Sequence, residues 1–325
     1  MSRSEYFGTV AETRGRLAVS CRCGAVLSLM LHHDAKTAPA VMVEKSGRCS
    51  AVVANAWPLP VGPVESGGSC PGVTSACRDC YAGGLEAAYP AFRRGMAENL
   101  DALHHLYGCG GVALVGRVLA DVVRHSATAQ RARDVVRPVW RWHSSGDVFA
   151  DWYARAIVRA VDATPDVEHW MYTRTLSAVG ILKRARGLSV YVSADSENVE
   201  RATRVAVRHG VPLAMLADDP AHAVALWGRA GAVAPGVLGR PVVCPATAKW
   251  AHDGRDVGGH VVGSDGRRSS VRRGAPGVGA CVACRVCLPS GSGRSVTFLV
   301  HGGKARGDSA GRLGAAVRVR LAVRS

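Results

Sequence analysis

The chain has 325 residues, of which 48% are hydrophobic, so it can bury a sizeable core and is not a disordered tail. Its 41 Lys and Arg against 25 Asp and Glu give a formal net charge of +16, a balance typical of proteins attracted to nucleic acid or to an acidic membrane surface. No run of about 18 apolar residues and no signal-peptide pattern is present, so we expect a soluble, cytoplasmic protein without a membrane partner.

The first elements along the chain are short. Residues 1–56 contain β-type runs at 40–44 and 51–54 and are expected to form an N-terminal β-containing segment. Residues 57–84 are rich in Pro and Gly and predict a long loop, which in a compact domain is usually functional. From 91 to about 125 the apolar spacing is helical but broken at Gly108–Gly111, so two helices are expected.

Strands and helices then alternate. The expected strands are residues 135–142, 169–173, 188–192, 211–215, 241–244 and 296–300. This alternation predicts an α/β fold with a parallel sheet, which we expect to form a TIM-type barrel, complete or incomplete. Residues 57–251 would be the barrel core, and the basic residues 252–325 would complete it with a C-terminal Cys-rich metal-binding segment.

Eleven cysteines in a reducing compartment, several at short spacings, favour metal binding over disulfides. Cys281, Cys284 and Cys287 follow a Cys-x2-Cys-x2-Cys pattern that can wrap around one ion or one iron–sulfur cluster. With His301 as fourth ligand the site would favour zinc, whereas Cys244 in that place would admit zinc or an iron–sulfur cluster.

A second group of thiols lies in the Pro- and Gly-rich loop. Cys70, Cys77 and Cys80 are spaced Cys-x6-Cys-x2-Cys and are also expected to bind metal. The remaining cysteines have weaker patterns and are expected to fill the core, as small buried thiols often do. They are Cys21, Cys23, Cys49 and Cys109.

Polar residues follow most of the expected strands, at the edge where parallel α/β folds build their sites. Asp147, Asp195 and Asp218 are candidates for the carboxylate nucleophile and the acid/base of a reaction at a glycosidic bond. A helix N-cap is the alternative role for each.

Three more residues at these strand ends are candidates for binding the substrate. Ser145 and Gly146 offer donors and room for a planar ligand. Arg174 could bind phosphate or form a salt bridge.

Several motifs are shared with one phage family. They are Leu59-Pro60, Ser-Cys-Pro-Gly at 69–72, Cys-Tyr-Ala at 80–82, Ser-Gly-Asp at 145–147, Tyr-Thr-Arg at 172–174, Cys244-Pro245 and the final three-cysteine group with its Phe and His-Gly. On these motifs the sequence resembles the gene-product-88-like family over most of the chain from Trp57 on. The resemblance implies a fold and a metal rather than one reaction, and a location in the host cytoplasm if the chain is phage-encoded.

Two other families share parts of the pattern. The loop with Cys70, Cys77 and Cys80 resembles that of radical-SAM enzymes, which hold a four-iron cluster with one open iron at the mouth of a barrel, although its first gap is six residues instead of three. The C-terminal cysteines and His301 are similar to the zinc site of queuine-type transglycosylases, although the spacing differs from the usual Cys-x-Cys-x2-Cys. Phage relatives of these transglycosylases exchange guanine in DNA for a 7-deazaguanine.

The leading hypothesis is therefore a nucleic-acid-modifying metalloenzyme, specifically a zinc-containing glycosyltransferase that exchanges guanine in DNA, or in tRNA, for a 7-deazaguanine precursor. One alternative is a radical-SAM-like [4Fe-4S] enzyme that modifies nucleic acid. Another is a zinc protein that binds nucleic acid without catalysis, and the polar strand ends argue against it.

Overall fold

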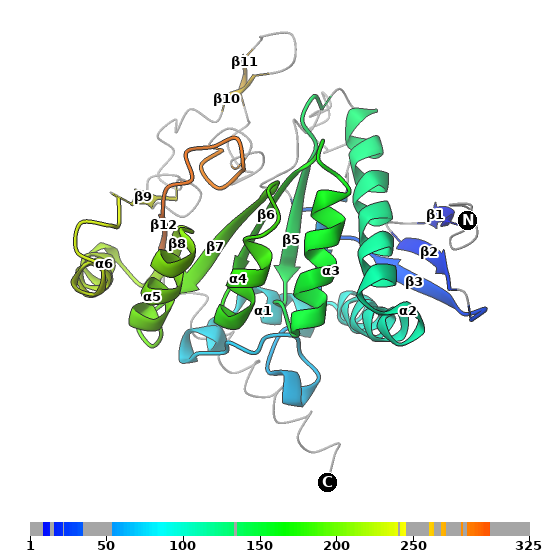
Figure 1. The fold of residues 1–325 in the computed structure, drawn as a ribbon, viewed down its shortest axis with the longest axis horizontal. Coiled ribbons are helices and arrows are strands. Elements are labelled where there is room, and N and C mark those ends of the chain that lie inside the picture. Colours follow the sequence, from blue (N-terminus) through cyan, green and yellow to red (C-terminus); the bar gives the residue numbers. More distant parts are fainter. Residues whose placement is uncertain are drawn as a thin grey trace.

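The computed structural model describes residues 9–13, 16–21, 23–34, 54–132, 135–239, 241–244, 260–262, 268–270, 281 and 285–299 (Figure 1). At its centre is a seven-stranded sheet in which every pairing is parallel, in the order β4-β5-β6-β7-β8-β12-β9. The strands are β4 (Ala56–Pro58), β5 (Val139–Ser145), β6 (Glu168–Thr173), β7 (Leu188–Ala194), β8 (Leu213–Ala217), β9 (Val242–Val243) and β12 (Val296–Leu299).

The expected α/β fold with a parallel sheet is confirmed. In the part of the chain that the structure describes, β4 and β9 are the two edge strands, so the sheet is open and does not show the closure of a barrel. Strand β12 pairs with both β8 and β9, and it thereby places a C-terminal strand inside the sheet. The short β4 was expected to be loop. Pro58 is compatible with a strand there because an edge strand does not need every N–H.

Helices connect the parallel strands. They are α1 (Tyr81–Ala88), α2 (Pro90–Arg131), α3 (Asp151–Asp162), α4 (Val179–Leu182), α5 (Val199–His209) and α6 (Pro220–Val233), with 3-10 helices η1 (Val64–Ser66), η2 (Ser75–Asp79) and η3 (Leu176–Ala178). Figure 1 shows α3, α4 and α5 in front of the sheet. The apolar stripe of α3, which includes Tyr153, Ile157 and Val161, is buried there as its spacing predicts.

Helix α2 consists of two halves. Gly110 and Gly111 have non-helical backbone angles, which confirms the predicted break in this region. By length and composition α2 could also cross a membrane, but core helices of soluble proteins pass the same test. Here Leu114, Val115 and Val118 of its second half are buried in the main core.

A second sheet packs against the first half of α2. It is antiparallel and consists of β1 (Thr9–Thr13), β2 (Arg16–Ser20) and β3 (Val26–Met30), while β10 (His260–Val262) and β11 (Arg268–Ser270) form a separate pair. Leu17 and Leu29 of this N-terminal sheet are buried in the same core as Leu106 of α2. The side chain of Asn99 hydrogen-bonds both backbone groups of Met30, at 2.7 and 2.8 Å, and thus ties the helix to β3.

Candidate metal centres

The loop between β4 and α1, residues 59–80, carries Cys70, Cys77 and Cys80 and is called the Cys loop below. It lies where the parallel strands β5, β6 and β7 end, and appears in Figure 1 as the blue segment along the lower edge of the sheet. Ligands of parallel α/β proteins bind at this carboxyl-terminal edge. The sequence-predicted thiol group is therefore at the position in the fold where a reaction centre is expected.

Each of the three sulfurs faces a backbone N–H. The N–H of Gly62 points to Cys70, the N–H of Thr74 is 3.5 Å from the sulfur of Cys77, and the start of α1 provides N–H groups to Cys80. Burial raises the pKa of the Cys70 and Cys80 thiols, and each lies close enough to Cys77 for its charge to raise the pKa further. N–H groups directed at sulfur stabilise thiolate ligands and tune the clusters they hold.

The Ser-Gly-Asp segment at the end of β5 packs directly on the Cys loop. Gly146 has φ +74°, and a Cβ added there would lie 2.3 Å from Oγ of Ser69 and 2.7 Å from Cβ of Leu59. The hydroxyl of Ser69 donates to the carbonyl of Pro60 at 2.7 Å. Ser145, for which we predicted substrate binding, is buried with its hydroxyl 3.0 Å from Sδ of Met96. The space beside Gly146, which was expected to admit a planar ligand, is thus occupied by the Cys loop.

Asp147 is buried, and its carboxylate accepts hydrogen bonds from within the protein. The donors are the N–H of Val148, the hydroxyl of Thr173 and the N–H of Arg174, each at 2.7 Å. Burial raises the pKa of Asp147 despite these donors. The carboxylate therefore joins the end of β5 to the end of β6.

Arg174 and Asp195 connect the next two strand ends to the Cys loop. They form a partly buried ion pair, and the hydroxyl of Thr74 donates to Asp195 at 2.6 Å and accepts from Arg174 at 3.0 Å. Burial opposes the charge of Arg174, but Cys77 and Asp195 raise the pKa of its guanidinium. Burial also opposes the charge of Asp195, but Arg174 and Thr74 lower the pKa of that carboxyl. A guanidinium thus lies beside one of the thiols.

Two more contacts complete the attachment of the Cys loop. The N–H of Ser75 donates to Glu197, which follows β7, at 2.8 Å. Gly72 lies so close to Arg174 that an added Cβ would be 2.4 Å from its carbonyl oxygen. The ends of β5, β6 and β7 therefore all hold one loop, the one with three thiols.

Asp218, the third candidate carboxylate, has a different environment. Its side chain is about half exposed and lies 3.2 Å from Nδ1 of His222. The neighbouring Asp219 caps helix α6 by accepting from the N–H of His222 at 2.8 Å. The helix N-cap role that the sequence offered for Asp218 is thus filled by Asp219.

Two of the C-terminal cysteines, Cys281 and Cys287, pack against Trp170 and Tyr172 of β6. Cys244 and Cys287 are close enough to Cys281 for their charges to raise its pKa further, with burial as the largest cause. The hydroxyl of Tyr172 donates to the sulfur of Cys287 at 3.1 Å. Cys284 and His301 lie outside the described residues, so the fourth ligand of this predicted site stays open.

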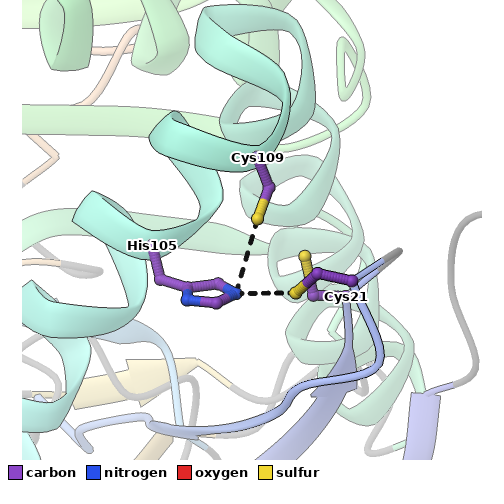
Figure 2. Close-up of side chains that lie close together, drawn as sticks. Cys21, His105 and Cys109 are labelled. Carbon is purple, nitrogen blue, oxygen red and sulfur yellow. Dashed lines mark hydrogen bonds between the residues drawn. The ribbon is translucent and has the colours of Figure 1, made fainter.

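Four other residues form a Cys/His cluster that could hold a metal ion, and we had expected its cysteines to be core filler. They are Cys21, Cys23, His105 and Cys109, whose candidate ligand atoms all lie within 4.8 Å of one another. Figure 2 shows His105 and Cys109 extending from α2 toward Cys21. Cys21 is buried, whereas Cys23 and Cys109 are exposed. This cluster is N-terminal, so it is not the C-terminal Cys-rich segment that the fold prediction named.

The sequence contains two local signals for this cluster. Cys21 and Cys23 are separated by one residue, and His105 and Cys109 are four apart in a helical stretch, on one face. A hydrogen bond from the backbone of Ala25, and others from Cys21 and His105, lower the pKa of Cys23 to about 6. The two signals are far apart along the chain, and only the fold brings them together.

Comparison with known proteins identifies relatives in phages. The chain is 33% identical over 178 residues to the Gene 88 protein of Mycobacterium phage D29, covering 54% of this chain and 71% of that protein. It is 32% identical over 173 residues to the Gene 88 protein of Mycobacterium phage L5, covering 52% of this chain and 69% of that protein. No solved structure matches.

A family model covers a longer part of the chain. The Gene product 88 model matches residues 28–289, which include the Cys loop and all three strand ends attached to it. The chain therefore belongs to the Gene product 88 family.

Proposed function

We propose that the protein is a nucleic-acid-modifying metalloenzyme whose reaction centre is an iron–sulfur cluster bound by Cys70, Cys77 and Cys80. The observation that carries the proposal is the attachment of one three-thiol loop to three consecutive strand ends, through Gly146, Asp195 and their neighbours. Three thiolates leave one iron of a four-iron cluster open to a small ligand, and such a cluster can supply single electrons.

The residues around the thiols fit this cofactor. Each sulfur has a backbone N–H directed at it, and the positive charge of Arg174 lies beside Cys77. Both features stabilise the negative charge of thiolate ligands. Thr74 and Asp195 fix the position of Arg174 through contacts that do not involve the metal.

The alternative of guanine exchange receives less support from the carboxylates. Asp147 already accepts three hydrogen bonds, and Asp195 is paired with Arg174. A nucleophilic carboxylate needs a free oxygen directed at the sugar. The radical-SAM-like reaction class is therefore the better supported of the two.

Charge supports a nucleic-acid substrate. The chain carries a formal net charge of +16, and Arg78 is exposed within the Cys loop itself, between two of the thiols. Contacts between basic side chains and phosphate groups are sensitive to salt and largely independent of the nucleotide sequence. We expect binding to duplex DNA or to tRNA that weakens steeply as salt increases.

The cofactor is tested on protein purified and reconstituted without oxygen. We expect about four iron atoms per chain and a brown visible spectrum, both lost in Cys77→Ala and kept in Arg78→Ala, the matched change in the same loop. A wild-type protein that binds no iron, or a Cys77→Ala variant with unchanged iron content, would refute the cluster. Filter binding of labelled DNA and tRNA at increasing salt tests the substrate, and absence of binding at low salt would contradict it.

A further inference from the structure

We propose that Cys21, Cys23, His105 and Cys109 bind one zinc ion that fastens the N-terminal sheet to helix α2. The inference does not depend on the proposed reaction centre, because it uses none of the Cys-loop thiols. Cys21 and Cys23 also lie outside the segment that the family model matches.

The distances fit a single tetrahedral ion. With Zn–S bonds of about 2.3 Å and Zn–N bonds of about 2.0 Å, tetrahedral geometry places sulfur and nitrogen ligands about 3.5 Å apart. Nε2 of His105 lies 3.1 Å from the sulfur of Cys23 and 3.5 Å from that of Cys109. The four ligand atoms, all within 4.8 Å of one another, therefore need only small shifts to surround one ion.

The backbone on both sides holds these side chains in place. Between β2 and β3 the N–H of Cys21 donates to the carbonyl of Ala25 at 2.8 Å, and the N–H of Gly24 donates to the carbonyl of Cys21 at 2.9 Å. Gly24 has φ +90°, which permits the tight turn that brings both thiols to one side. On α2 the four-residue spacing of His105 and Cys109 places them one turn apart on the same face.

The donor set selects the metal and its role. Three thiolates and one imidazole favour zinc over magnesium or calcium, which prefer oxygen ligands. Four protein ligands also close the coordination sphere, as in structural zinc sites, whereas catalytic sites keep one position for water or substrate. We therefore assign this zinc a structural role.

The metal would add a link to the contact between the N-terminal sheet and α2. The N-terminal sheet has three short strands, and it is attached to α2 mainly through side chains such as Leu17, Leu29 and Leu106 and through Asn99. A small sheet of this kind is stabilised by burying its apolar face, here against a helix. A zinc ion bound by Cys23 and His105, 82 positions apart, adds a covalent-like link at the turn end of the sheet.

The test is the zinc content of the full-length chain, measured by mass spectrometry of the metal after purification under reducing conditions. We expect Cys109→Ser and His105→Ala each to lose about one zinc per chain. His104→Ala is the matched control, because its ring lies against Phe149 and Trp152 instead, and it should keep the metal. Cys109→His retains a ligand and should also keep the zinc.

A second measurement separates metal binding from folding. Chelation of the zinc should increase hydrogen exchange in β2 and β3 and leave β6 and β7 unchanged. Unchanged zinc content in Cys109→Ser would overturn the proposal, and so would a disulfide among Cys21, Cys23 and Cys109 found by alkylation and peptide mapping. Iron loss in Cys77→Ala reports on the Cys loop alone, so the two proposals fail independently.

Discussion

Replacing Gly146 with Ala tests how the Cys loop is held against the end of β5. The new Cβ would lie 2.3 Å from Oγ of Ser69 and 2.7 Å from Cβ of Leu59, at a backbone φ of +74°. The left-handed backbone costs about 1–2 kcal/mol for a residue with a Cβ, and forcing an extra carbon into a packed site costs about 1–3 kcal/mol. Together they predict a loss of about 2–5 kcal/mol in the free energy of unfolding.

Two other glycines separate these contributions. Gly67 has φ +78° but nothing within 4 Å of an added Cβ, so Gly67→Ala should show the backbone cost alone, about 1–2 kcal/mol. Gly228 lies in helix α6 with open space around it, so Gly228→Ala should be neutral or stabilise by up to about 1 kcal/mol.

Urea unfolding followed by tryptophan fluorescence suits the comparison, because Trp57 and Trp142 are fully buried. The expected order of midpoints is Gly228→Ala highest, Gly67→Ala intermediate and Gly146→Ala lowest. Equal midpoints for the Gly67 and Gly146 variants would refute the close contact with Ser69 and Leu59, and with it the attachment of the loop to β5.

Two predictions concern the carboxylates at the strand ends. Arg174 and Thr74 lower the pKa of Asp195, so the stabilisation by its carboxylate should be complete above the ordinary pKa of 3.8 and be lost as the pH falls through the lower folded value. The difference in unfolding free energy between wild type and Asp195→Asn, measured by urea unfolding from pH 7 to pH 3, should therefore shrink only at the acid end. A constant difference would argue against the ion pair. Asp147→Asn places an amide NH2 near the three groups that donate to Asp147 and should lower the free energy of unfolding by about 1–3 kcal/mol. Asp218→Asn should change it by no more than about 0.5 kcal/mol. The reverse order in thermal unfolding would contradict the environments assigned to these two carboxylates.

The parallel sheet could be predicted because its central strands have strong local patterns. Residues 169–173 and 188–192 were expected as strands and correspond to β6 (Glu168–Thr173) and β7 (Leu188–Ala194). β4 was missed because three residues ending in Pro58 have no periodicity to detect. The position of β12 between β8 and β9 depends on long-range pairing, and chain order does not reveal it.

The candidate sites were predictable to the extent that their residues are close in sequence. The convergence of Asp147, Arg174 and Asp195 follows from parallel strands ending at one edge. Their common partner was not predictable, because Thr74 and Asp195 are 121 positions apart. The Cys/His cluster was missed for the same reason, since neither half has enough ligands alone to indicate a metal.

The Cys loop and the Cys/His cluster differ in what survives when the metal is lost. Oxygen and nitrogen groups on the strand ends, such as Asp195 and Glu197, hold the loop without help from sulfur. If the proposed iron–sulfur cluster were lost, the Cys loop would therefore keep its attachment to the sheet. At the hairpin turn the proposed zinc ion itself would link Cys23 to His105, so oxidation of the Cys23 thiol would release the hairpin from the helix at that end.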